Sequence, residues 1–392
     1  TECDIHPAMK FADQFMKYLF QLGHQPQIST AEITAVLSLQ HINTSAPHHQ
    51  ENFLVLETDE QLNCVGLIET LGGTIKIMQK TDFTNITDYL LTKKSEGKIH
   101  FSLSGPNNRQ LALEAKKTLK SAGCSARYIE PKNTATILHN SLIQRQTDLT
   151  IFANEIYVTK AIQPFEEFNR RDYDRPQSDN KSGMLPPKLA RIMINLARIP
   201  KDVTILDPFC GSGTILTEAA VMGYRNLIGS DISAKAAADT EKNLDWMKDT
   251  YHVSHITYQL FETPSDQLTK HIKSTSVDAI ITEPFLGSPL TGRENRDKLH
   301  AQVDELEKLY IDSFKTFSKI LKPSGVVLFI IPKFLYKGEW VEIDCVDKIK
   351  KTGFQTVPFE ILDSPSTEHL TYHRPDQHLA RTIWKFTPII HN

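Results

Sequence analysis

Asp207-Pro-Phe-Cys-Gly-Ser-Gly-Thr214 is the stretch on which the fold of this chain depends, because a strand pattern gives way there to a helix pattern. The apolar run Val203–Leu206 precedes it, and a helical pattern over Thr214–Met222 follows it. Glycines at 211 and 213 allow the backbone to bend tightly and to approach a ligand closely. This order of strand, glycine turn and helix predicts the first unit of a doubly wound α/β sheet.

The C-terminal half continues the alternation of strands and helices from Lys188 onward. Further strands are predicted at Asn226–Ser230, Val277–Thr282 and Gly325–Ile331, and further helices at Ala234–Trp246 and Gln302–Leu321. We expect the last two strands, Gln355–Phe359 and Leu379–Phe386, to form a long hairpin that completes the sheet.

A carboxylate ends the second of these strands, in Gly229-Ser-Asp231, 18 residues beyond Gly213. Such an acid can accept hydrogen bonds from both hydroxyls of a ribose. Nicotinamide cofactors and S-adenosylmethionine both offer that ribose, so the two motifs alone do not choose between them. Against a dinucleotide, Leu216 replaces the third glycine of Gly-x-Gly-x-x-Gly, and an acid stands at 207. S-adenosylmethionine carries no phosphate, and Asp207 could neutralise its ammonium group.

The N-terminal half is predicted to hold two small α+β units. The first has strands at Lys17–Leu22, Asn52–Glu57 and Thr74–Met78, a helix over Ser29–Gln40 with Ser29 and Glu32 at capping-box spacing, and a helix ending at Leu71. The second begins near Ser95, with strands at Ile99–Ser104 and Ala126–Ile129, helices at Leu111–Ser121 and Thr134–Arg145, and a hairpin over Leu149–Ala161 that turns at Ala153-Asn154.

Residues 164–187 are rich in proline and charge, which predicts a linker leading into a helix that starts near Pro187. A chain of 392 residues with 40% apolar and 23% charged residues is typical of a multidomain globular protein. Its apolar runs are too short for a membrane span, so we expect no membrane association. Five widely spaced cysteines indicate a reducing, cytoplasmic compartment, and neither they nor the histidines show metal-ligand spacing.

Residues 93–132 contain nine Lys or Arg and only three acidic residues, a local excess of positive charge. The whole chain, in contrast, has a net charge of −3. Because salt screens each charge beyond about 10 Å, such a surface can hold phosphates on an acidic protein. A solvated helix face is the alternative interpretation.

The sequence also resembles a known family. Asp207–Gly213 looks like motif I of amino-group methyltransferases. The stretch Arg171-Asp172, Arg175-Pro176, Gly183-Met-Leu-Pro-Pro-Lys-Leu-Ala190 resembles the entry to the catalytic domain of the THUMP-domain tRNA (guanine-N2-)-methyltransferase family. Leu22-Gly23, Ser29, Glu32-Ile33 and Leu71-Gly72-Gly73-Thr74 are similar to that family's opening domain, so the resemblance covers nearly the whole chain.

The resemblance implies an α/β fold in which a Rossmann-like class I methyltransferase domain is preceded by ferredoxin-like and THUMP α+β domains. The expected segments are a ferredoxin-like domain over 1–94, a THUMP RNA-binding domain over 95–165, a linker over 166–186 and the methyltransferase domain over 187–392. The implied cofactor is S-adenosyl-L-methionine, and the residues expected to bind it are Asp207, Phe209, Gly211, Gly213, Thr214, Asp231 and Ile232. Glu262 is the candidate for the acid that such enzymes place against the adenine amino group.

The segment after the fourth strand departs from the family's pattern, which is an Asp or Asn, two prolines and an aromatic residue. Here the chain reads Glu283-Pro284-Phe285-Leu286-Gly287, and shifting the alignment by one residue makes Thr282 the first member. We predict that Glu283 accepts hydrogen bonds or protons from the N1/N2 edge of guanine. Pro284 stiffens the loop, and Phe285 helps to hold the flipped base. A structural turn with a core-facing Phe285 is the alternative.

The expected activity is methylation of the N2 amino group of a guanosine in tRNA. The RNA-binding candidates are Arg170, Arg171 and Arg175 near the active-site entrance, and Lys116, Lys117 and Lys120 in the basic segment. Arg171 could instead pair with Asp172 or Asp174 at the surface. Two other functions remain open: an rRNA or DNA amino-methyltransferase, and an inactive RNA-binding protein with a degenerate methyltransferase domain. Some members of the family work with a small activating subunit, and no residue here indicates one.

Overall fold

The computed structural model describes residues 15–94, 97–177, 184–253, 256–290, 295–375 and 377–390, so Gly183 of the family-like stretch lies outside it. The chain divides into two compact units. The first contains the chain up to Leu22, Gln40–Ile68 and Thr74–Gln163, and the second contains Gly23–Leu39, Glu69–Gly73 and the chain from Pro164 onward. Short N-terminal stretches therefore belong with the C-terminal half.

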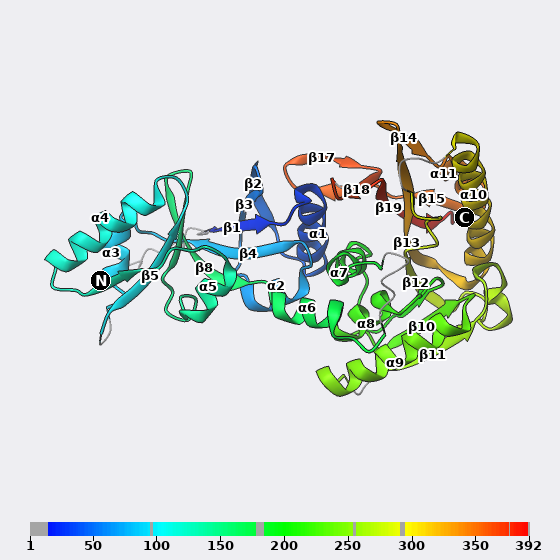
Figure 1. The fold of residues 1–392 in the computed structure, drawn as a ribbon, viewed down its shortest axis with the longest axis horizontal. Coiled ribbons are helices and arrows are strands. Elements are labelled where there is room, and N and C mark those ends of the chain that lie inside the picture. Colours follow the sequence, from blue (N-terminus) through cyan, green and yellow to red (C-terminus); the bar gives the residue numbers. More distant parts are fainter. Residues whose placement is uncertain are drawn as a thin grey trace, which may run out of the picture. The chain divides into compact units, whose positions relative to one another are not determined.

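The first unit is built on one eight-stranded sheet with the strand order β2-β3-β1-β4-β8-β7-β5-β6 (Figure 1). Its strands are β1 (Met16–Leu22), β2 (Thr44–Gln50), β3 (Phe53–Thr58), β4 (Thr74–Lys80), β5 (Ile99–Ser104), β6 (Ala126–Tyr128), β7 (Asp148–Phe152) and β8 (Glu155–Ile162). The antiparallel pairing of β4 with β8 makes the sheet continuous across the two predicted N-terminal segments.

The helices of the first unit are α3 (Ile86–Leu91), α4 (Asn108–Ser121) and α5 (Thr134–His139), while α2 (Cys64–Thr70) crosses the division between units. In α4 the buried residues Ala112, Ala115 and Leu119 recur at helical spacing and face the core, as the amphipathic pattern predicts. The predicted β7–β8 hairpin is confirmed. Its turn residues Ala153 and Asn154 have φ of 48° and 62°, the left-handed values of a tight two-residue turn.

The second unit is built on a nine-stranded sheet whose main path is β11-β10-β9-β12-β13-β19-β15. The strands from β11 to β13 are parallel, and β19 is antiparallel to both of its neighbours. The bounds are β9 (Thr204–Asp207), β10 (Asn226–Asp231), β11 (Thr257–Glu262), β12 (Val277–Thr282), β13 (Leu321–Tyr336), β14 (Glu339–Glu342), β15 (Phe354–Thr356), β16 (Phe359–Ile361), β17 (Ser364–Thr367), β18 (His369–His373) and β19 (Leu379–Pro388). The predicted closing pair corresponds to β15 and β19, which do pair, although β16, β17 and β18 intervene.

Helices lie on both faces of this sheet, as a doubly wound fold requires (Figure 1). They are α1 (Pro26–Leu39), α6 (Phe165–Tyr173), α7 (Pro187–Leu196), α8 (Thr214–Val221), α9 (Ala234–Tyr251), the 3-10 helix η1 (Ser265–Lys270), α10 (Arg296–Ile320) and α11 (Val346–Lys350). Apolar residues of α1, α7 and α8 form one core with one face of the sheet. Residues of α10 and α11, including Phe314 and Phe317, form a second core with the other face.

The predicted cap at Ser29 is wrong, because α1 begins at Pro26 and Ser29 lies inside the helix. The Ser29 hydroxyl donates to the carbonyls of Gln25 and Gly73. The Glu32 carboxylate accepts hydrogen bonds from the backbone N–H groups of Gly72 and Gly73 and from the amide of Asn195 on α7. The two residues with capping-box spacing therefore join α1 to the Gly72-Gly73 turn and to α7.

The linker expected over residues 166–186 is also wrong in its first part, where the chain forms α6. Pro164 precedes the helix, acids fill its first turn and Arg170 and Arg171 fill its last turn, an arrangement that suits the helix dipole. Phe168 is buried on this helix. The helix predicted to start near Pro187 is confirmed as α7.

Candidate active site

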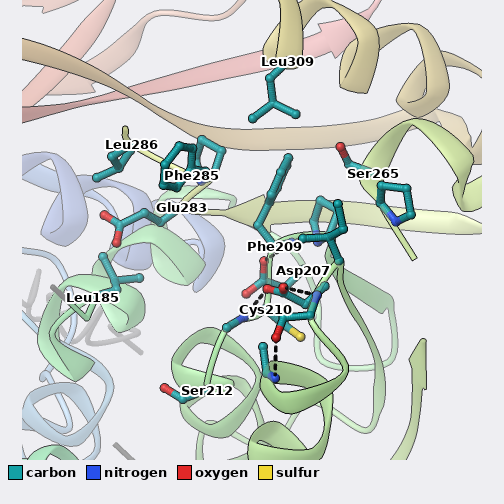
Figure 2. Close-up of a pocket in the computed structure, with 18 of the residues that line it drawn as sticks. Leu185, Asp207, Phe209, Cys210, Ser212, Ser265, Glu283, Phe285, Leu286 and Leu309 are labelled. Atoms are coloured by element: carbon teal, nitrogen blue, oxygen red, sulfur yellow. Dashed lines mark hydrogen bonds between the residues drawn. The ribbon is translucent and has the colours of Figure 1, made fainter. Parts of the chain in front are cut away.

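The carboxyl ends of β9 and β12 lie side by side, because these two strands pair in parallel. The strand order of the sheet reverses between them, and ligands of doubly wound folds bind at such a point. Across this point the hydroxyl of Thr282 donates a hydrogen bond of 2.7 Å to the carboxylate of Asp207. A cavity of about 920 Å³ opens here (Figure 2). It is lined by residues of the glycine turn, the ends of β10 and β12, the start of η1 and one side of α10.

The glycine turn holds a backbone shape that favours glycine. Gly211 and Gly213 have φ of 53° and 82°. A Cβ at Gly213 would lie 2.8 Å from the Thr240 side chain, whereas a Cβ at Gly211 would meet no atom within 4 Å. Gly213 therefore keeps the turn compact against α9, and Gly211 leaves open space for a ligand to approach.

Two buried side chains of α9 fix the glycine turn from behind. The Thr240 hydroxyl donates to the Gly211 carbonyl at 2.8 Å, and the Asn243 amide donates to the Ser212 carbonyl at 2.8 Å. Sequence analysis missed both residues. The signal that could have revealed them is a polar pair three residues apart that shares the buried face of α9 with Leu244 and Met247.

Asp231 lies at the end of β10, where the motif predicts it, and it lines the cavity. One carboxylate oxygen accepts a hydrogen bond from the backbone N–H of Gly211 at 3.0 Å, and the other accepts from Ser233 at 2.9 Å. A carboxylate oxygen can accept more than one hydrogen bond, so both remain able to accept ribose hydroxyls.

Asp207 is buried at the centre of the cavity wall, with an exposed fraction of 2%. Its Oδ1 accepts hydrogen bonds from Thr282 and from the backbone N–H of Phe209. Burial raises the pKa of this carboxyl to about 7, and the like charges of Asp231 and Glu283 push it the same way. A cation next to Asp207 would stabilise its ionised form against the effect of burial. The site therefore fits the ammonium group of S-adenosylmethionine.

Ile232, Ser265 and Asp266 also line the cavity. Ile232 is 75% exposed, so its side chain is free to cover a flat ring. Glu262 does not line this cavity. It lies with Ala234 and other residues of α9 and β11 around a separate surface hollow.

The displacement of Glu262 has a local cause. The chain turns at Thr263, whose N–H donates to the Asp231 carbonyl, and it meets the cavity only at Pro264, Ser265 and Asp266. The sequence signal that could have found Asp266 is the Pro-Ser-Asp start of η1.

Glu283, Pro284 and Phe285 line the cavity. Figure 2 shows Glu283 and Phe285 on the opposite side from Ser265, with Asp207 between them. Oε1 of Glu283 accepts a hydrogen bond of 2.6 Å from Nε of Arg381 on β19. Burial raises the pKa of Glu283 above its ordinary value, although Arg381 opposes this. Phe285 is 59% exposed, which contradicts the core-facing alternative.

Helix α10 fixes the loop that follows Glu283. The hydroxyl of the buried Tyr310 donates to the Phe285 carbonyl at 2.8 Å. The backbone N–H of Ser288 donates to the side-chain oxygen of Gln302 at 3.0 Å. Sequence analysis missed Arg381, Tyr310 and Gln302, because each is far from Glu283 along the chain.

Two of the arginines predicted to contact RNA are buried instead. Arg171 and Arg175 have exposed fractions of 4% and 5%. Arg171 and Arg191 both pair with the buried carboxylate of Glu218 on α8, so neither the phosphate contact nor the surface pair with Asp172 or Asp174 occurs at Arg171. Arg175 donates to the hydroxyl of Thr214, the first residue of α8.

The remaining RNA-binding candidates are accessible. The side chain of Arg170 is 50% exposed and lies 3.8 Å from Glu167. Lys116, Lys117 and Lys120 are exposed on α4, in the first unit. Phe209 and Thr214 line the cavity of the second unit, and Gly213 lies in the turn beside it.

Two family models match the chain. One, described as an RMKL-like methyltransferase domain, matches residues 175–334 and includes the glycine turn and Glu283. The other, described as a DNA methylase, matches residues 77–242 and ends within α9.

Curated relatives carry the comparison further. A probable tRNA (guanine(10)-N2)-dimethyltransferase of Methanothermococcus thermolithotrophicus is 32% identical over 143 residues, which are 36% of this chain and 78% of that relative. The chain belongs to the tRNA guanine-N2 methyltransferase family. The family's tRNA (guanine(10)-N2)-dimethyltransferase from Methanothermobacter thermautotrophicus is 37% identical over 43% of this chain and 45% of its own length. This chain thus matches less than half the length of that relative.

The fold of the family is also found in solved structures. The crystal structure of TrmN from Thermus thermophilus matches 95% of this chain and 100% of its own, with a TM-score of 0.54 and 14% identity. This likeness shows the fold, a mixed α/β architecture with a Rossmann-like methyltransferase unit.

Three further observations concern the described residues alone. None of their helices is long and apolar enough to cross a membrane. They contain no group of three or more His, Cys, Asp or Glu side chains that could hold a metal ion. Their cysteines, Cys64, Cys124, Cys210 and Cys345, are free and buried.

Proposed function

We propose that this chain is an S-adenosyl-L-methionine-dependent tRNA methyltransferase that modifies the N2 amino group of a guanosine. One observation carries the proposal: a single cavity holds the ribose acid Asp231, the buried acid Asp207 and, at its far side, Glu283 beside the exposed ring of Phe285. This arrangement provides for a nucleoside cofactor and a flat amine-bearing acceptor in one space. Membership of the family supports the same reaction.

Different residues of the cavity bind the cofactor and the acceptor base. Bound S-adenosylmethionine supplies a methyl group activated by its sulfonium. Asp231 accepts the ribose hydroxyls, and Asp207 neutralises the ammonium group. Ile232 covers the adenine ring. We assign the contact with the adenine amino group to Asp266 rather than Glu262, because only Asp266 lines the cavity.

The acceptor base is held by the Glu283 side of the cavity. Phe285 offers an exposed aromatic face on which an unstacked guanine can lie. Glu283 accepts a hydrogen bond from the N2 amino group. It takes up the proton that this nitrogen loses when its bond to the methyl carbon forms and the bond from that carbon to sulfur breaks, leaving a thioether. Catalysis then depends mainly on holding the amine in line with the methyl group.

The first unit is proposed to bind the tRNA. Lys116, Lys117 and Lys120 lie exposed on one helix, and exposed lysines attract phosphates without reading sequence. We retain the ferredoxin-like assignment for 1–94, the THUMP assignment for 95–165 and a cytoplasmic location as proposals. The buried free cysteines support the location.

The decisive experiment incubates the protein with radiolabelled cofactor and separate pools of tRNA, rRNA and DNA, and then digests the products to nucleosides. The proposal expects labelled N2-methylguanosine or its dimethyl form from tRNA. Label in rRNA or DNA would support the other methyltransferase function. Absence of cofactor binding in calorimetry would support the inactive RNA-binding protein.

Two sets of variants test the assigned residues. Glu283→Ala should reduce turnover strongly, whereas Glu241→Gln, an exposed change on α9, should not. Turnover of Glu283→Ala within a factor of two of wild type would refute the role of Glu283. Changing Lys116, Lys117 and Lys120 to Ala should weaken tRNA binding and flatten its salt dependence while cofactor affinity is unchanged.

A matched control for the lysine variant replaces exposed lysines of the second unit. Lys270, Lys273 and Lys319 are suitable, because replacing these three exposed lysines with Ala removes the same amount of positive charge from the second unit. Equal loss of tRNA affinity in both triple variants would contradict a specific role for α4.

A further inference from the structure

The contact between Glu283 and Arg381 joins two elements 98 residues apart in the chain. The side chains of Arg381 and Glu283 are only 9% and 13% exposed. Arg381 lies on β19 opposite Pro332 of β13 and Tyr372 of β18, so strands on both sides hold its backbone. It also lies outside residues 175–334, the segment matched by the methyltransferase family model.

The hydrogen bond uses only part of each group. Nε of Arg381 donates to Oε1 of Glu283. Within the part of the chain that the structure describes, Oε2 of Glu283 accepts no protein hydrogen bond. The pair therefore fixes one oxygen of the carboxylate and leaves the other available, on a side chain that lines the cavity.

The charges around Glu283 show why this partner matters. Asp207 faces it from β9, and Tyr310, whose pKa burial raises well above its ordinary value, faces it from α10. The other charged residues that line the cavity are Glu305, Lys308 and Asp312 of α10, Asp231 of β10, Lys235 and Asp239 of α9, and Asp266 of η1. Arg381 is the cation in direct contact with the carboxylate, and it opposes the rise in the pKa of Glu283 that burial causes.

The altered segment 283–287 also indicates that Glu283 needs a partner to hold it in place. Phe285 replaces the second proline, so the loop loses one fixed backbone angle. Glutamate also has one more rotatable bond than aspartate between its backbone and its carboxylate. Both changes would loosen the acceptor group unless another contact held it.

We propose that Arg381 is the positioning residue of the acceptor site. Its Nε–H holds Oε1 of Glu283, so that Oε2 meets the amino group to be methylated, and this contact replaces the rigidity that the missing proline would supply. The inference rests on the proposed methyl transfer. It assigns to the last strand of the sheet a role in the acceptor site.

The test compares wild type, Arg381→Met and Arg381→Lys in tRNA methylation between pH 6 and 9, together with calorimetric cofactor binding. Arg381→Met should lower kcat at pH 7 by roughly 10–100-fold, because a displaced acceptor group loses its alignment. The KM and Kd for cofactor should stay unchanged.

The pH profile provides the readout that a structural role would not move. Glu283 acts as a carboxylate, and removing a neighbouring cation raises its pKa, so the acidic limb of the profile should shift upward by about one pH unit or more in Arg381→Met. Arg381→Lys keeps the charge and loses the planar guanidinium, so it should retain the wild-type limb with a reduced kcat. Lys385→Met, four residues along β19, is the control for perturbing this strand.

The outcomes separate the two proposals. If wild type methylates tRNA and Arg381→Met shows the same kcat and the same limb, the role of Arg381 is refuted while the function stands. If wild type methylates no nucleic acid, the proposed function fails. Should Arg381→Met fail to fold, Arg381→Lys decides, and an unchanged kcat in that variant overturns the inference.

Discussion

Replacing Asp207 with asparagine should stabilise the empty protein and weaken cofactor binding. Burial raises the pKa of Asp207 from 3.8 to about 7. At about 1.4 kcal/mol for each pH unit between these values, the ionised carboxylate costs the folded protein up to about 4 kcal/mol. Asparagine removes the charge but keeps a side-chain oxygen that can accept from Thr282 and Phe209.

The sign of this effect depends on pH. Below the unfolded value of 3.8 the carboxyl is protonated in both states, so the substitution brings no gain. The gain grows as pH rises towards 7 and is complete above it. The Asp207→Asn variant should therefore show a Tm similar to that of wild type near pH 4. At pH 8 its Tm should be higher, by roughly 2–4 °C for each kcal/mol gained.

Differential scanning calorimetry at pH 4, 6 and 8 measures the stability, and titration calorimetry with S-adenosylmethionine measures the affinity. Loss of a charged hydrogen bond should weaken binding roughly 10–100-fold. Wild type should also release protons as it binds, since the ammonium group favours the ionised form of Asp207. An Asp207→Asn variant that binds as tightly as wild type, or is destabilised equally at every pH, would refute this account of the acid.

Four further substitutions test other parts of the second unit. Gly213→Ala should cost about 2–3 kcal/mol in urea unfolding, because its φ is 82° and a Cβ would crowd Thr240; an unchanged midpoint contradicts this. Glu218→Gln should cost about 3–5 kcal/mol, nearly independent of salt, because two buried arginines lose their partner; a strongly salt-dependent or negligible loss argues otherwise. Asp266→Asn should weaken cofactor binding several-fold and Glu262→Gln should not, and the reverse order would restore Glu262 to the adenine site.

Strands buried in the sheets could be predicted well from sequence. The bounds of β5 and β12 agree with the prediction at both ends, because apolar residues and turn signals delimit them. Strand β2 was missed, since Thr-Ser-Ala-Pro-His-His-Gln shows neither an apolar face nor β-branched enrichment. Helix α6 was missed because its flanking prolines suggested a linker, although its charges suit a helix.

The candidate site was predictable where it is local in sequence. Three of its residues lie together because the carboxyl ends of parallel strands meet on one side of the sheet. Asp207 ends β9, Gly211 follows β9, and Asp231 ends β10. The contact of Glu283 with Arg381 could not be predicted from sequence. The two residues are 98 positions apart, and Arg381 comes close to Glu283 only because β19 pairs with β13. The burial of Arg171 could not be predicted either. Its partner Glu218 is the only charged residue of α8, and the sequence of that helix does not indicate a partner for it.

The interleaving of the two units affects how the chain can be made and recombined. Residues of α1, such as Ile28 and Ala31, share a core with α7, which leaves the ribosome some 160 residues later. The apolar side of α1 therefore lacks this partner while the intervening residues are synthesised. Grafting the N-terminal half of this chain onto another C-terminal half at one junction would separate Glu32 from Asn195. A viable exchange would have to keep 23–39 and 69–73 with the recipient.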